Sequence, residues 1–298
     1  MRFDSYHPAI NFMFFAAAIT MAICFNQPVF LALSYLTSFT YSVKLNGVKA
    51  AIFNLVLIPL ILLYTWIYSG YNHFGITNLA VNFIGNRITL ESVTVGLVIG
   101  ITIAVVLMWL SCVHAVISSD KVVYLFGRIS PKLSLFLSIL LRMVPRIKEK
   151  AKKIHTAQKC IGKGIGQGNP FRRACNLFRI ISIVIAWTME NFIETSESMR
   201  SRGYTLKKRT AFSIYRFDYR DRTMVISMFL FITVILMGIL FDQTRILYNP
   251  EIIMNKVTPL SAAFYLAYAS FCLMPMALQI FGEFRWKMRV FVKLSKEY

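Results

Sequence analysis

Six stretches of the chain are apolar over a length that approaches or reaches a membrane span. A helix that crosses a bilayer needs roughly 20 mostly apolar residues, so the pattern predicts an all-α integral membrane protein with about six transmembrane helices. The second stretch is short and only Asn26 and Gln27 precede it, so we expect the first two to form a tight helical hairpin. The stretches are Ala9–Phe25, Pro28–Val43, Ala50–Tyr68, Ser92–Val113, Thr223–Phe241 and Val257–Phe281.

Two long helical segments are predicted in the interval between the fourth and fifth stretches. The first begins near Pro131, which suits the first turn of a helix, and runs to about Ile161. Its first half is apolar but too short to span a bilayer, so we expect it to lie against the membrane or under other helices. Pro145 predicts a kink or the end of a first helical piece.

The second half of this segment is amphipathic. One face carries a mostly apolar series at helical spacing, formed by Val144, Ile147, Ala151, Ile154, Gln158 and Ile161. A basic stripe beside it consists of Lys148, Lys152, His155 and Lys159. Two interpretations of the stripe are open: a solvated face, or attraction to anionic lipid headgroups or an acidic partner.

The second segment runs from about Phe171 to Arg202. Gly203 predicts the end of the helix and leaves Arg202 in the last turn, where a cation suits the helix dipole. The glycine-rich run 162–170 between the two segments matches no nucleotide-binding pattern and predicts a helix stop and a flexible turn. An apolar stripe on this second segment comprises Ile181, Ile185, Met189, Phe192 and Met199, with Glu190, Glu194 and Glu197 on another side.

Composition agrees with a membrane protein and indicates its orientation. Hydrophobic residues make up 57% of the chain, against about 45–50% in soluble proteins. There are 33 Lys and Arg against 13 Asp and Glu, and with the N-terminus inside only Arg87, Arg245 and Lys256 fall on the outer side. This positive-inside bias explains the charge more simply than nucleic-acid binding does. We therefore expect cytoplasmic termini, membrane regions over 1–113 and 223–298, and a cytoplasmic helical region over 114–222.

Little in the sequence points to chemistry carried out by this chain. The six apolar stretches hold no Asp, Glu, Lys or Arg, which argues against a proton- or sodium-coupled carrier. The Gly96 and Gly100 pair has G-x-x-x-G spacing and is interpreted as helix packing only. We expect no cofactor, metal site or catalytic group, because the candidate ligands are scattered: Cys24, Cys112, Cys160, Cys175, Cys272, His7, His73, His114 and His155.

Two motifs carry a resemblance to a known family. The stretch 199–204, Met-Arg-Ser-Arg-Gly-Tyr, resembles the second signature of the T components of energy-coupling factor (ECF) transporters, the EcfT/CbiQ type. The hydrophobic layout around the motifs also fits that family. The first coupling helix of the family is matched by Leu141, Arg142, Met143, Val144, Pro145, Glu149, Ala151, Ile154, Ala157, Gln158 and Gly162.

The resemblance implies two docking sites and one further surface. In the family, each of two long cytoplasmic helices ends in an Ala-Arg-Gly-type triplet that docks on an ATP-binding cassette (ABC) ATPase. Ser201, Arg202 and Gly203 match the second triplet, whereas Cys160, Ile161 and Gly162 match the first without its arginine. Lys159 supplies a nearby charge but no planar guanidinium. The expected surface for the S component or the membrane contains Leu133, Phe136, Leu137 and Leu140.

The resemblance implies a non-catalytic coupling subunit of an ECF-type ABC uptake transporter in a bacterial or archaeal cell membrane. Two ABC ATPase subunits would hydrolyse ATP, and a small membrane S component would bind the imported micronutrient, a vitamin or a metal. This chain would transmit closure of the ATPases to the S component within the lipid bilayer. Two alternatives are a self-contained permease or channel and a membrane lipid-modifying enzyme, for which the three glutamates of the second segment would be the candidate acids.

Overall fold

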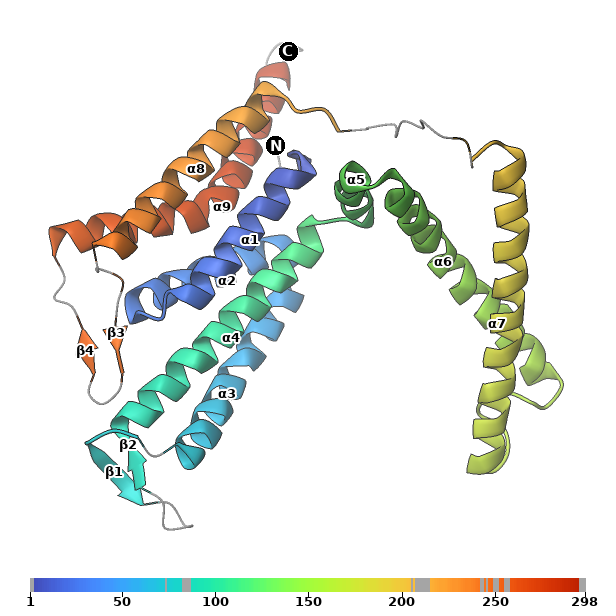
Figure 1. Ribbon diagram of the computed structural model, residues 1–298, viewed down its shortest axis with the longest axis horizontal. Coiled ribbons are helices and arrows are strands. Elements are labelled where there is room, and N and C mark those ends of the chain that lie inside the picture. Colours follow the sequence, from blue (N-terminus) through green and yellow to red (C-terminus); the bar gives the residue numbers. More distant parts are fainter. Residues whose placement is uncertain are drawn as a thin grey trace. The chain divides into compact units, whose positions relative to one another are not determined.

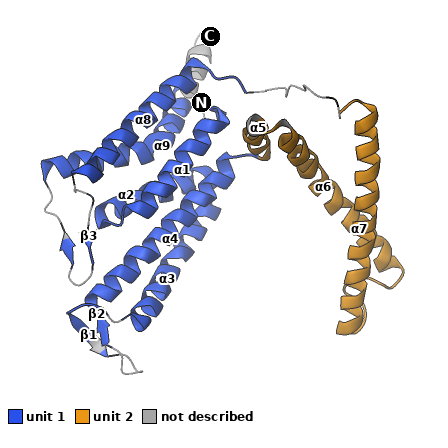
Figure 2. Ribbon diagram, in the orientation of Figure 1, with its two compact units in different colours: residues 1–118, 215–298 blue, residues 119–214 orange. Residues whose placement is uncertain are grey.

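The chain forms two compact units, shown in different colours in Figure 2. Residues 1–118 and 215–298 build the first unit, and the intervening residues 119–214 build the second. The two ends of the chain therefore share one unit. The structure is a computed structural model that describes residues 3–72, 74–81, 87–204, 206, 215–241, 244, 246–248, 252–254 and 258–294.

Long helices form the first unit (Figure 1). Most of each apolar stretch predicted from the sequence lies in one of them, and the prediction of an all-α membrane protein is confirmed. A short 3-10 turn, Phe3–Ser5, precedes the first helix. The long helices are α1 (Pro8–Cys24), α2 (Pro28–Asn46), α3 (Val48–Tyr71), α4 (Leu90–Val116), α8 (Tyr219–Leu240) and α9 (Pro259–Leu294).

The helices that are long and apolar enough to span a membrane differ in part from the six spans predicted from the sequence. Among the described residues, α3, α4, α8, α9 and the second-unit helix α7 (Pro170–Ser201) are long and apolar enough to cross a membrane. Helix α1 falls short with 17 residues. Helix α7 qualifies with a mean hydropathy of 1.2 over its most apolar stretch, although the sequence predicted it to be a helix outside the bilayer.

Helix α2 is less apolar than its neighbours because it carries polar residues on its inner side. These residues recur three or four positions apart and share one face. The hydroxyls of Thr37 and Ser38 donate to the carbonyls of Leu33 and Tyr35, at 2.8 and 3.1 Å. Since α2 packs against α3, α4 and α9, its polar face is covered by helices. The buried polar residues are Ser34, Thr37, Ser38 and Ser42.

Two small antiparallel hairpins connect helices of the first unit. Strands β1 (Asn78–Val81) and β2 (Arg87–Thr89) lie between α3 and α4. Strands β3 (Ile246–Leu247) and β4 (Ile253–Met254) lie between α8 and α9. The phenol of Tyr248, just after β3, donates a hydrogen bond of 2.7 Å to the carbonyl of Asn26 in the α1–α2 turn. This bond ties the second hairpin to the start of the bundle.

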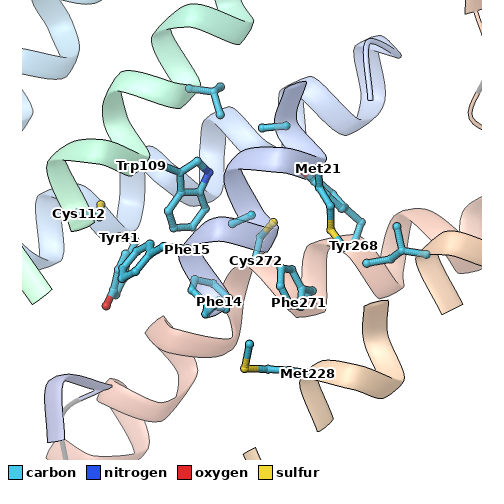
Figure 3. Packing of buried hydrophobic residues seen from close by; sticks show 14 of the residues in the cluster. Phe14, Phe15, Met21, Tyr41, Trp109, Cys112, Met228, Tyr268, Phe271 and Cys272 are labelled. Atoms are coloured by element: carbon cyan, nitrogen blue, oxygen red, sulfur yellow. The ribbon is translucent and has the colours of Figure 1, made fainter. Parts of the chain in front are cut away.

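Aromatic residues from α1, α4 and α9 form the centre of the bundle (Figure 3). Trp109 is fully buried, and its ring lies edge-on to Phe14 and Phe15 with centroids 5.9 and 6.1 Å away. Phe14 also contacts Phe271 of α9, at 5.1 Å between centroids. Such pairs prefer edge-to-face or offset geometry, which fixes how the three helices meet.

Helices α3 and α4 approach closely at the Gly96 and Gly100 pair. A methyl group at Gly96 would lie 3.3 Å from the backbone of Thr65, and one at Gly100 would lie 3.1 Å from the side chain of Ile61. Both glycines therefore face α3 at near-contact distance. The interpretation of this motif as a packing device is confirmed.

The second unit contains α5 (Ser119–Ile129), α6 (Pro131–Cys160) and α7. The bounds of α6 and α7 agree closely with the two predicted segments. The expectation that Pro145 could end a first helical piece is wrong, because α6 continues through it. Helix α5 packs against the start of α6, where the hydroxyl of Ser134 donates to the carbonyl of Val123 at 3.3 Å.

Candidate functional site

The C-terminal tip of α6 ends in a Schellman motif. Gly162 adopts a φ of 75°, a left-handed value that favours glycine. Its N–H donates to the carbonyl of Lys159 at 3.1 Å, and the N–H of Lys163 donates to the carbonyl of Gln158 at 2.9 Å. Ile161 is therefore the C-cap residue of this helix, and its side chain is 66% exposed.

The tip of α7 has the same construction. Gly203 has a φ of 74° and donates to the carbonyl of Arg200 at 3.1 Å. The N–H of Tyr204 donates to the carbonyl of Met199, also at 3.1 Å. Arg202 is the C-cap residue and is exposed. The two triplets picked out by the sequence, 160–162 and 201–203, thus present their middle residues from equivalent helix ends.

The segment between α6 and α7 is held by polar contacts. The amide oxygen of Gln167 accepts from the N–H of Gly164 at 3.0 Å. The side-chain amide of Asn176, in the first turns of α7, donates to the carbonyl of Gly164 at 3.2 Å. Pro170 then occupies the first turn of α7, after Asn169. The predicted flexible turn is therefore better described as a turn tied to the helix that follows it.

Helices α6 and α7 pack along a face that the sequence located only in part. Met143 and Ile180 are buried, and the ammonium group of Lys150 lies 5.0 Å from the centre of the Trp187 ring. A cation over an indole face contributes about 0.5–1 kcal/mol at an exposed site. Val144 was predicted on the apolar face of α6 but is 61% exposed.

Two members of the predicted basic stripe lie beside α7. Lys152 and His155 line a hollow of about 380 Å³ with apolar side chains of α7, so they do not belong to a purely solvated face. Lys148 and Lys159 are exposed. The rest of the lining comprises Ala151, Ile165, Leu177, Ile180, Ile181, Val184 and Ile185.

The predicted apolar stripe of α7 is largely uncovered within the described residues. Ile181, Ile185 and Met189 are 42%, 53% and 61% exposed. At the other end of the unit, Leu133 and Phe136 of α6 are 45% and 59% exposed. Their predicted companions Leu137 and Leu140 are half-buried. Both helices therefore expose apolar side chains within the described part of the second unit.

Lys153 and Glu149 form an ion pair of 2.8 Å, one helical turn apart on α6. A hydrogen bond from Lys153, with its positive charge, holds the pKa of the Glu149 carboxyl below its ordinary value. Within the described residues, no three His, Cys, Asp or Glu side chains converge as a metal-ligand group. His73 lies outside those residues.

Sequence reasoning missed three features of the second unit. Helix α5 has 11 residues and no long apolar run, so nothing marked it as a separate element. The Lys150–Trp187 contact joins residues far apart in the chain and has no local signal. Asn176 is one of several polar residues in the first turns of α7, so its contact with Gly164 has no distinctive signal in the sequence.

The sequence around both helix tips matches a known protein family. The family model described as cobalt transport protein, CbiQ, matches residues 3–212. The match covers α1 to α7 and both helix tips, and α8, the β3–β4 hairpin and α9 follow it. The chain belongs to the cobalt transport protein family. It is a multi-pass membrane protein of a transport family.

Proposed function

We propose that this chain is the transmembrane coupling subunit of an ECF-type ABC uptake transporter. The observation that carries the proposal is the pair of equivalent helix ends, each with an exposed C-cap residue inside a triplet that resembles the family's docking motif. Membership in a cobalt transport family supports a role in transport. The imported micronutrient would be a vitamin or a metal, bound by a separate S component.

The distance between the two tips favours two separate ATPase contacts. Helices α6 and α7 are joined by a short turn and pack together, so the α6 tip lies near the start of α7 while Arg202 lies at its end. Because α7 has 32 residues, it is about 48 Å long. Two ABC ATPase subunits can then each receive one tip, and their closure would move both ends of the hairpin.

The two tips would use different contacts. The guanidinium of Arg202 can bind a carboxylate or a backbone carbonyl through two parallel hydrogen bonds. Ile161, at the equivalent position, offers only apolar area. We therefore assign Ile161 to an apolar pocket on its ATPase, with Lys159 and Cys160 at the rim and Gly162 fixing the turn.

The uncovered apolar faces of the second unit would meet the S component and the lipid bilayer. Leu133 and Phe136 expose apolar area at the start of α6, and the stripe of α7 exposes more. Exposed apolar area of this extent usually marks an interface. The unit would lie on the cytoplasmic side, with both termini of the chain on the same side, in a bacterial or archaeal cell membrane.

An affinity pull-down of the chain from its native membrane tests the proposal. We expect two ABC ATPase subunits and a small hydrophobic protein to be retained. Arg202→Glu should reduce recovery of the ATPases at least tenfold, because a carboxylate replaces the guanidinium at the docking tip. Arg179→Glu is the matched control, since Arg179 is an exposed arginine in the same helix away from the tip.

Three outcomes would contradict the coupling role. The ATPases could remain bound to the Arg202→Glu protein and transport could stay normal, which would show that Arg202 makes no docking contact. The Arg179→Glu control could lose them equally, which would indicate a general charge effect. The chain could also purify alone and bind a solute itself, which would favour a self-contained permease.

A further inference from the structure

A hollow of about 930 Å³ in the first unit opens between α8, α9 and Tyr6, which lies between the 3-10 turn and α1. Its volume is near the upper end of the range for small-molecule sites. Helix α8 contributes residues three, four and seven positions apart, so one face of this helix lines the hollow. The lining comprises Tyr6, Tyr219, Arg220, Thr223, Met224, Ser227, Met274, Leu278, Phe281, Gly282 and Arg285.

Charged and apolar side chains occupy different ends of this hollow. Arg220 lies in the first turn of α8, and Arg285 lies four residues beyond Phe281, where the predicted apolar stretch of α9 ends. Deeper along the same two helices, Met224, Met274 and Leu278 supply apolar walls. From Met274 to Arg285 the α9 face rises about 16 Å at the standard helical rise. The hollow is therefore cationic at the helix ends and apolar toward the bundle.

The acids nearest in sequence to these arginines have partners elsewhere. The two carboxylate oxygens of Asp221 accept from the N–H groups of His7 and Asp218, at 3.2 and 3.0 Å. The carboxylate of Glu283 pairs with the ammonium of Lys44 at 2.8 Å. None of these acids lines the hollow. Among the described residues, the charged side chains that line the hollow are those of Arg220 and Arg285.

A hydroxyl donor completes the mouth. Burial raises the pKa of the Tyr6 phenol; the nearby Arg220 charge opposes this rise, and the Asp221 charge adds to it. The phenol therefore keeps its proton at neutral pH and can donate to an anion. Phe281 is 70% exposed at the rim, so the hollow is open to molecules in the surrounding bilayer.

We propose that this hollow binds one anionic phospholipid, with Arg220 and Arg285 on its phosphate and the acyl chain along Met224, Met274 and Leu278. Basic pockets at the ends of membrane helices suit anionic headgroups, and the apolar walls suit a chain that a free phosphate lacks. The site belongs to the first unit alone and does not depend on the coupling role. A lipid there would join α8 and α9 to the start of the chain.

Native mass spectrometry of the purified chain, titrated with phosphatidylglycerol or phosphatidylcholine, tests the site. We expect one phosphatidylglycerol to be retained in preference to phosphatidylcholine. The double variant Arg220→Gln, Arg285→Gln should weaken this binding by roughly fivefold for each arginine. Arg216→Gln with Arg222→Gln is the matched control, because these arginines flank the same helix start without lining the hollow. Its binding should change less than twofold.

Two further arms separate a lipid from other ligands. Leu278→Trp fills the apolar part while both arginines remain, so it should also weaken phosphatidylglycerol binding. Glycerol phosphate in solution should not displace the lipid. Equal retention of the two lipids, equal losses in both arginine pairs, an unaffected Leu278→Trp protein, or displacement by glycerol phosphate would each overturn the proposal.

Discussion

Ile161 and Arg202 are the C-cap residues of two helix ends that share one hydrogen-bond pattern and one backbone conformation. The following glycines have φ values of 75° and 74°. The two positions therefore differ in side-chain chemistry but share the same place and backbone geometry at a helix end. One offers a branched alkyl group, and the other offers a guanidinium.

This equivalence predicts that an acid at Ile161 is as disruptive as one at Arg202. Ile161→Asp would place a charge in the apolar pocket that we assign to its ATPase, and should reduce ATPase co-purification at least tenfold. Thr156→Asp adds the same charge to an exposed position about one turn earlier and serves as the control. Full retention of the ATPases by Ile161→Asp would show that the α6 tip does not dock.

Gly162→Ala should destabilise the α6 tip through its backbone alone. A methyl group there meets no atom within 4 Å, so the cost comes from the left-handed φ of 75°, about 1 kcal/mol. Hydrogen exchange at the amide of Lys163, which donates to Gln158, should become faster. Gly166→Ala, equally open but without a left-handed φ, should leave exchange unchanged. Equal effects of both substitutions would refute this account.

The close approach of α3 and α4 predicts an order of sensitivity. Gly96→Ala places a methyl group 3.2 Å from the Tyr68 ring and 3.3 Å from the backbone of Thr65, and this backbone cannot move without shifting α3. Gly100→Ala meets first the side chain of Ile61, which can change rotamer. Overpacking costs about 1–3 kcal/mol, so thermal unfolding in detergent should fall for both variants and fall further for Gly96→Ala. A larger loss of thermal stability in Gly100→Ala would contradict this explanation.

The native cysteines provide a direct test of the proposed orientation. Cys160 and Cys175 are exposed in the second unit, and Cys24 is exposed at the end of α1, whereas Cys112 and Cys272 are buried. In intact cells, a membrane-impermeant maleimide should label Cys24 but reach Cys160 and Cys175 only after permeabilisation. Single-cysteine variants identify each signal. Labelling of Cys160 in intact cells would place the second unit outside.

The sequence predicted helices well and their faces less well. Proline and glycine mark the bounds of α6 and α7, because these residues act on the local backbone. Which side of a helix meets its neighbour depends on distant residues. Met143 is buried while Val144 is exposed, although periodicity favoured Val144. The contact between Lys150 and Trp187 shows that a long cationic side chain can occupy a packed face.

The two candidate sites, the helix tips and the hollow beside α8 and α9, also differ in how far the sequence could predict them. Both tips could be located from sequence, because each docking triplet is contiguous and ends at a helix stop. The hollow beside α8 and α9 could not, because it joins Tyr6 to residues more than 200 positions away. No short motif records that meeting, and Arg220 and Arg285 look in sequence like ordinary flanking charges of membrane helices.

The inward polar face of α2 has a consequence for how the chain enters the membrane. A helix whose buried serines and threonines depend on packing against helices such as α3, α4 and α9 gains little from partitioning into lipid by itself. Helix α9 follows α2 by more than 200 residues in the chain, so these hydroxyls remain without part of their cover until α9 has been made. Biogenesis of this protein is therefore expected to be cooperative, with α2 depending on its neighbours for stable insertion.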